Sequence, residues 1–109
     1  MSTVKIADLR HRVVVEEPVR TPDGGGGAIQ TWSPIAEVWA EIRPLNGSER
    51  VVADAIAGRI THEIWMRWRE GVGPHLRLRY GSRIFDLLSV LDVDEQHRFL
   101  RCLVEERLS

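Results

Sequence analysis

Two stretches of alternating hydrophobic and polar residues flank residues 44–58. A period of two along the chain is typical of β-strands with one buried face, because successive side chains point to opposite sides. The clearest case predicts a strand over residues 59–69 and places on its core face the side chains of Ile60, His62, Ile64, Met66 and Trp68. The same alternation predicts a strand over residues 38–43.

Other alternating or apolar segments predict the remaining strands, over residues 9–19, 28–32, 75–80, 83–93 and 98–107. Turn-forming residues separate them, including a Gly-rich turn at 21–27, a break at Ser33-Pro34 and a two-residue turn at Gly81-Ser82. Six or seven short strands at regular spacing predict an all-β fold, either a small barrel or a sandwich. The pattern has no internal repeat and no linker, so we expect one domain over residues 1–109.

Residues 44–58 form a long connection between two predicted strands. Ordinary hairpin loops have roughly 2–5 residues, so this segment is too long for a tight hairpin. Its apolar content argues against a solvated tail, and Asn46 with Glu49 resembles a capping box that would start a short helix before Gly58. The apolar stripe that includes Val51 and Ile56 has two interpretations: it packs on the core of its own chain, or it docks on a neighbouring subunit.

Length, charge and cysteine content exclude several classes of protein. The 109 residues carry a formal net charge of −1, which argues against a generally basic surface that coats nucleic acid. Cys102 is the sole cysteine and alternates with Leu100 and Val104, so we expect a buried thiol and no internal disulfide. No apolar run approaches the roughly 20 residues of a membrane span. The first residues lack the apolar core of a signal peptide, which predicts a cytosolic product without membrane contact.

The residues that most often carry catalysis or bind metals are scattered. Four histidines fall on four different predicted segments without the spacing of a metal-binding motif, and Cys102 has no basic partner in a recognisable motif. The acidic cluster Asp92, Asp94 and Glu95 lies at a predicted turn and lacks the pattern of a calcium loop. We therefore expect no enzyme activity, no metal and no cofactor.

Arginine and tryptophan alternate on two consecutive predicted strands. The side chains are Trp65, Arg67 and Arg69 on the first strand, and Arg77 and Arg79 on the second. If the two strands pair across the short link at 70–74, these residues share one basic face with an aromatic ring beside it. Such a face suits a protein interface, because Arg and Trp are frequent hot-spot residues. Two alternatives stay open: a solvated face whose arginines pair with Glu63 and Asp86, and a nucleic-acid surface.

The order of motifs along the chain resembles the head–tail joining proteins of tailed phages, also called head closure or stopper proteins, including their prophage and gene-transfer-agent versions. The resemblance covers residues 9–105 and rests on LRHRVVVEEP, DGGGGAIQTW, VWAEIRPLNGSE, THEIWMRWREGVGPHLRLRYGSRIFDLLSVLDVDE and LRCLVEE. Many relatives carry an aromatic residue just after the G-x-E motif, where this chain has Val51 and Val52.

The resemblance implies a structural protein of the virion neck. Proteins of that family form a ring, expected to be twelve-fold, between the portal and adaptor on one side and tail terminator or tail tube proteins on the other. The ring closes the channel on the packaged double-stranded DNA of a filled head and offers a surface for tail attachment. The resemblance implies a small β-barrel whose long loop over residues 44–58 points into the channel. The alternative function is a small β-barrel that binds nucleic acid.

Two sets of site residues follow from these expectations. The predicted channel-closing residues are Gly47, Ser48, Glu49, Arg50, Val51, Val52, Asp54 and Ile56. The predicted contacts with other subunits and neck proteins are Trp65, Arg67, Arg69, Arg77 and Arg79.

Overall fold

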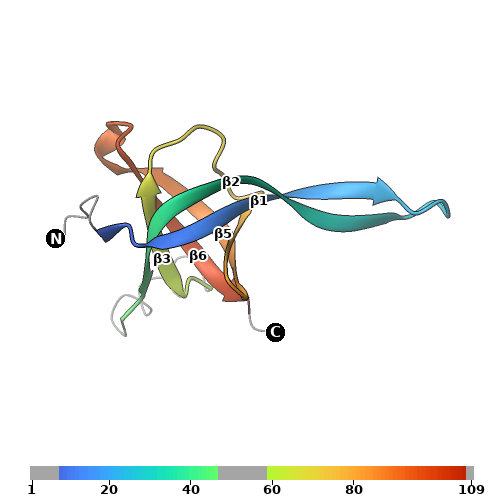
Figure 1. The fold of residues 1–109 in the computed structure, drawn as a ribbon, viewed down its shortest axis with the longest axis horizontal. Coiled ribbons are helices and arrows are strands. Elements are labelled where there is room, and N and C mark those ends of the chain that lie inside the picture. Colours follow the sequence, from blue (N-terminus) through green and yellow to red (C-terminus); the bar gives the residue numbers. More distant parts are fainter. Residues whose placement is uncertain (1–7, 47–58, 108–109) are drawn as a thin grey trace.

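Six antiparallel strands close into a small barrel (Figure 1). The computed structural model describes residues 8–46 and 59–107. The strands are β1 (His11–Pro22), β2 (Ala28–Pro44), β3 (His62–Arg67), β4 (Arg77–Tyr80), β5 (Arg83–Asp92) and β6 (Phe99–Arg107), with a short 3-10 helix η2 (Val93–Glu95) before β6. Around the barrel their order is β1-β2-β3-β6-β5-β4, and β4 pairs with β1 to complete the circle. The predicted all-β fold is confirmed.

The barrel core is built from the residues that alternate inward along the strands. Ile64 and Met66 of β3 are fully buried, and Leu78 of β4 is buried against them in the same cluster. Cys102 and Val104 of β6 also have no exposed surface, as the alternation predicts. Burying an apolar side chain of this size contributes about 1.5–3 kcal/mol, so the core depends on many similar contributions.

The predicted break at Ser33-Pro34 is wrong, because β2 runs without interruption through both residues. The register explains how the strand accommodates the proline. Val15 pairs with Ala36 and Glu16 pairs with Pro34, so Ile35 is an extra residue in β2. Such a bulge bends the strand and interrupts the ladder, and a proline beside it loses little hydrogen bonding. The predicted strands 28–32 and 38–43 are therefore two parts of one strand.

The predicted pairing of the strand at 59–69 with the strand at 75–80 is also wrong. One edge of β3 pairs with β2 and its other edge pairs with β6. A strand has two edges, and both edges of β3 are occupied. β4 lies instead between β1 and β5, although a short link joins it to β3 along the chain.

The hairpin of β1 and β2 extends well beyond the barrel (Figure 1). The molecule measures 52 × 29 × 26 Å, and this hairpin accounts for its long axis. β4 pairs with β1 at residues 14–16, and β3 pairs with β2 at residues 40–44. Between these points, among the described strands, β1 and β2 pair with each other alone. We call residues 17–33 the hairpin arm.

The tip of the hairpin arm is a turn at the predicted position. Asp23 donates its backbone N–H to the carbonyl of Gly27 (3.2 Å), and its carboxylate accepts from the N–H groups of Gly25 and Gly27. Gly24 and Gly26 have φ values of 85° and 86°, which other residues adopt with strain. The turn was predicted from the sequence, but the projection of the strands that lead to it was not.

Most of the predicted 44–58 loop, including all eight predicted channel-closing residues, lies outside the described residues. Its short helix and its role therefore stay predictions. The described residues on either side are informative, because Leu45 donates its N–H to the carbonyl of Thr61 (3.1 Å). Pro44 also pairs with His62. The described residues that flank this segment therefore lie next to each other, at the end of the β2–β3 ladder.

Candidate functional site

A buried carboxylate lies at the base of the hairpin arm. Glu16 is 5% exposed and is the residue at which β1 leaves β4, since its pairing with Arg77 is the final pair of that ladder. Its carboxylate accepts hydrogen bonds from Arg77 Nε (2.8 Å) and Arg79 Nε (3.1 Å). Charged side chains are rarely buried unless they are paired in this way.

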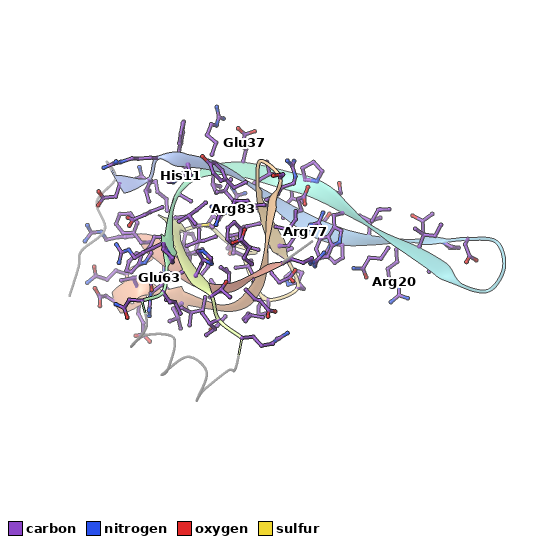
Figure 2. All side chains as sticks on the ribbon, turned by 90° about the horizontal axis from the view of Figure 1, so that it is seen from below. His11, Arg20, Glu37, Glu63, Arg77 and Arg83 are labelled. Atoms are coloured by element: carbon purple, nitrogen blue, oxygen red, sulfur yellow. The ribbon has the colours of Figure 1, made fainter. Side chains whose placement is uncertain are left out.

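The indole ring of Trp32, on the other strand of the hairpin arm, contacts one of these arginines. Trp32 of β2 pairs with Pro18 of β1, and the guanidinium of Arg77 lies 4.4 Å from the centre of the indole ring. Figure 2 shows Arg77 where the arm joins the barrel and Arg20 further out along the arm. We call Glu16, Trp32, Arg77 and Arg79 the arm-base cluster. It joins both strands of the arm to β4 through an ion pair and a cation–π contact.

Two opposing effects set the pKa of Glu16. Burial raises the pKa, because it disfavours the charged carboxylate. The hydrogen bonds from Arg77 and Arg79, with their positive charges, act in the other direction and prevail. The pKa of Glu16 therefore lies below its ordinary value of 4.5. In a second pair, the hydrogen bond from Arg83 likewise lowers the pKa of Glu106.

We expect the protein to lose stability in acid. A carboxylate with a lowered pKa stabilises the fold above its ordinary value of 4.5, and this contribution is lost as the pH falls through the lowered pKa. The melting temperature should therefore decrease as the pH is lowered below 4.5, and the Glu16→Gln variant should show a smaller decrease. Thermal unfolding followed by circular dichroism across that range measures both. An equal acid dependence in the two proteins would exclude Glu16 as a cause.

A second buried carboxylate lies on the outer wall of the barrel. Glu63 of β3 is 3% exposed and accepts hydrogen bonds from Arg101 of β6 (2.7 Å) and Arg43 of β2 (3.2 Å). The indole N–H of Trp65 also donates to Glu63 (3.2 Å). This network spans three neighbouring strands, so it fixes the ring of Trp65 on the wall.

The five predicted interface residues do not share one face. Arg77 and Arg79 belong to the arm-base cluster, whereas Trp65 lies in the Glu63 network on β3. Arg67 and Arg69 are exposed at the end of β3 and just beyond it, and the ion pairs found in the described residues do not include them. The proposed single basic face fails because β3 and β4 are not neighbours. A role of these residues in neck contacts stays a prediction.

One alternative from the sequence was that Glu63 and Asp86 pair with the arginines of the predicted basic face. Both carboxylates do bind arginines, but these are other arginines. Glu63 binds Arg43 and Arg101, and Asp86 binds Arg107 at 2.6 Å. Glu16 was not among the residues predicted from the sequence. Its position in the alternation points outward from the barrel, and nothing in the local pattern distinguishes a covered outward glutamate from a solvated one.

The described residues hold no group of three or more metal-binding side chains. His62, which the alternation places on the core face, is half-buried and packs edge-on against Phe85 with 5.4 Å between the ring centres. Its Nδ1 lies 2.8 Å from the hydroxyl of Thr61. In the described part of the chain, no helix has the length and apolar character needed to span a membrane.

Comparison with known proteins gives a consistent result. The family model of the phage head completion protein matches residues 4–107. Among solved structures, this chain is similar to a chain from the virion of a native gene transfer agent particle, with 34% sequence identity and a TM-score of 0.67. The match covers 93% of this chain and 97% of the gene-transfer-agent chain. No curated protein matches the sequence.

A second solved structure is similar in fold. The solution structure of protein SF1141 from Shigella flexneri 2a has a TM-score of 0.75 with 22% identity, and covers 94% of this chain and 96% of that one. At this level of identity, the likeness shows a shared fold and carries no argument about function.

Proposed function

Because the chain belongs to the phage head completion protein family and is a structural component of the virion, we propose that it forms a homo-oligomeric ring in the neck between head and tail. In this proposal, the ring lies between the portal and adaptor on one side and the first tail proteins on the other. It closes the channel on the packaged double-stranded DNA and provides the surface to which the tail attaches.

The observation that carries the proposal is the extent of the family match. It runs over residues 4–107 and therefore includes the barrel, the hairpin arm and the 44–58 segment. The gene-transfer-agent chain, which comes from an assembled particle, is likewise similar over nearly the full length of both chains. This supports assembly of the whole chain with other structural proteins.

The chemistry of the described residues fits a structural role. The buried carboxylates of Glu16 and Glu63 are held by arginines, and the partly buried Glu106 is held by Arg83. Burial raises the pKa of Cys102 to about 12, so its thiol is not a nucleophile at neutral pH. We infer that the chain assembles and does not catalyse a reaction.

We propose that the 44–58 segment closes the channel. The described residues on its two sides are joined at the end of the β2–β3 ladder by the hydrogen bond between Leu45 and Thr61. A segment with such closely spaced ends acts as a single projection from each subunit, and a ring of subunits presents a ring of projections. Its acidic residues Glu49 and Asp54 would repel phosphate and keep DNA from binding to the channel wall.

The nucleic-acid-binding alternative has less support. It relied on a shared face of arginines, and the arginines at the arm base are engaged by Glu16. Arg67 and Arg69 are exposed but lie elsewhere, at the end of β3 and just beyond it. The formal net charge of −1 also gives little general attraction for phosphate.

Cryo-electron microscopy of purified particles tests the proposal. We expect the chain to be found as a ring between the portal side and the tail. Particles made without the chain should lack that density, and expression of the chain in the same cells should restore it. Finding the chain in the head shell or in the tail tip would contradict the proposed neck ring.

A further inference from the structure

Exposed apolar surface in the described part of the chain is concentrated on the β1–β2 hairpin. Four of its five large exposed hydrophobic residues belong to this one element: Val19 (37% exposed), Ile29 (57%), Ile35 (46%) and Trp39 (52%). The fifth is Leu91 on β5. Single exposed hydrophobic residues are common, but several on one element indicate an interaction surface.

The outer part of one face of the hairpin arm is made of uncharged β-branched side chains, and the exposed Glu17 lies on the same face nearer the barrel. Val19 pairs with Thr31 and Thr21 pairs with Ile29, so these four residues lie on the same side of the two-stranded ribbon. We call them the arm face. Along β1, Val19 continues the alternation of Val13 and Val15, which are buried in the core. The arm face thus extends the core-facing side of the sheet past the end of its own barrel.

A second apolar surface lies on the outer wall of the barrel. Ile35, Glu37 and Trp39 are spaced two residues apart along β2 and therefore share one face of the strand, and Figure 2 shows Glu37 on its outer side. The guanidinium of Arg12 lies 5.1 Å from the ring centre of Trp39 and pairs with Glu37 at 2.6 Å. We call Ile35 and Trp39 the wall patch.

We propose that the hairpin arm is the clasp between subunits of the ring: the arm face of one copy packs on the wall patch of the next copy. This inference rests on the ring of the proposed function. Contacts in a ring are heterologous, so each subunit must carry two different complementary surfaces. The arm face lies on the inner side of the sheet and the wall patch on its outer side. The arm of each subunit can therefore lie over the outer wall of the next subunit around the ring.

The dimensions and charges of the two surfaces agree with this arrangement. Residues 17–22 of β1 extend about 20 Å at about 3.3 Å per residue, which is most of the width of a neighbouring barrel. The barrel end of the molecule is bounded by the shorter dimensions of 29 and 26 Å. The four residues of the arm face carry no charge, so they suit an apolar wall better than phosphate. Glu37, which lies between the two residues of the wall patch, is neutralised by its ion pair with Arg12.

The arm-base cluster holds the clasp ready for binding. Glu16 binds Arg77 and Arg79, and Arg77 also lies over Trp32, so both strands of the arm are tied to β4. An arm with a fixed direction loses less conformational freedom when it binds, which increases affinity without added contacts. Isolated two-stranded ribbons are only marginally stable, so this support at the base matters for the arm itself.

Disulfide cross-linking in particles tests the clasp. The double variant Ile29→Cys with Trp39→Cys should give a ladder of covalent multimers of the chain on a non-reducing gel. The native Cys102 is fully buried and should not react. The matched control is Ile29→Cys with Leu91→Cys, which moves the second thiol to an exposed hydrophobic position away from the hairpin. This control should give no ladder.

The outcomes separate the clasp from the proposed function. A chain found in the neck without a ladder, or cross-linked through Ile29→Cys to a protein of another size, would overturn the clasp and leave the neck ring standing. A wild-type chain that is absent from the neck would overturn both. Equal ladders from the double variant and its control would also exclude a specific clasp.

A charge on the arm face gives an independent measurement. Ile29→Asp should lower incorporation into particles by roughly tenfold, the factor that corresponds to about 1.4 kcal/mol of binding free energy. Gln30→Asp, an exposed neighbour on the opposite face of the arm, should incorporate normally. Circular dichroism should show the same thermal unfolding for both variants. Normal incorporation of Ile29→Asp, or equal loss in both, would contradict the clasp.

Discussion

Deleting residues 49–57 should leave the barrel folded, while filled heads that carry the shortened chain should lose their DNA. The hydrogen-bonded circle of six strands is made entirely by residues outside this segment, so the barrel does not need it to close. Because the chain on either side of this segment meets at one place, fifteen residues from 44 to 58 could reach at most roughly 25 Å, half of their length at about 3.3 Å per extended residue. Such projections from all subunits of a ring could meet at its axis.

The expected loss of DNA is large because the deletion removes, from every subunit, the weak contacts that we propose to close the channel. Val51, Val52 and Ile56 are aliphatic, and burying each contributes only about 1.5–3 kcal/mol, multiplied around the ring. Many weak contacts can hold the channel shut and still open when the tail attaches. The loss of DNA is measured as the DNA content of purified tailless heads. The stability of the barrel is measured by thermal unfolding of the isolated variant.

A matched control separates the length of the segment from its side chains. Replacing residues 49–57 by glycine and serine keeps the length and removes the apolar contacts, so these heads should also leak. Heads with normal DNA content after the deletion would contradict channel closure by this segment. Unfolding of the barrel after the deletion would show that the apolar stripe belongs to the core of its own chain.

Replacing Glu16 by alanine should strongly destabilise the fold. The change leaves Arg77, whose side chain is 15% exposed, without its main partner at the base of the arm. Breaking a buried ion pair costs about 3–5 kcal/mol, and we expect roughly 2–4 kcal/mol because Arg79 is partly exposed. For a domain of this size, that corresponds to a decrease in melting temperature of about 10–20 °C.

Glu17→Ala is the matched control for this variant. Glu17 is the next residue along β1 and is exposed, so its removal should change the free energy of unfolding by less than about 0.5 kcal/mol. Urea unfolding of both variants at neutral pH measures the difference directly. If both variants unfold like the wild type, the Glu16 ion pairs only offset the cost of burying their charges.

The alternation of the sequence predicted the strands and their inward faces well. It placed Ile64, Met66, Cys102 and Val104 in the core, and all four are buried without exposed surface. Side-chain period is a local property, because it follows from backbone geometry within one strand. It therefore carries reliable information about which face of each strand is buried.

Which strands pair with each other in the sheet could not be predicted from the alternation of side chains. The pairing of β3 with β2 and β6 depends on residues far away along the chain, and a short link to β4 was a misleading guide. The continuity of β2 through Pro34 was missed because the bulge at Ile35 exists only in the context of its pairing with β1. The burial of Glu16 and Glu63 likewise depends on arginines from other strands.

Beyond Glu16, one edge of β1 is exposed to other molecules before the subunit is assembled. That edge has no neighbouring strand among those described, and an unpaired edge can recruit strands from other molecules into fibres. Pro18 and Pro22 lie on this stretch of β1 and remove two N–H groups that such stacking would need. We therefore expect free copies to resist aggregation through their backbones at this edge. In the proposed ring, contacts between copies would then be made by side chains, and such contacts can form and break reversibly.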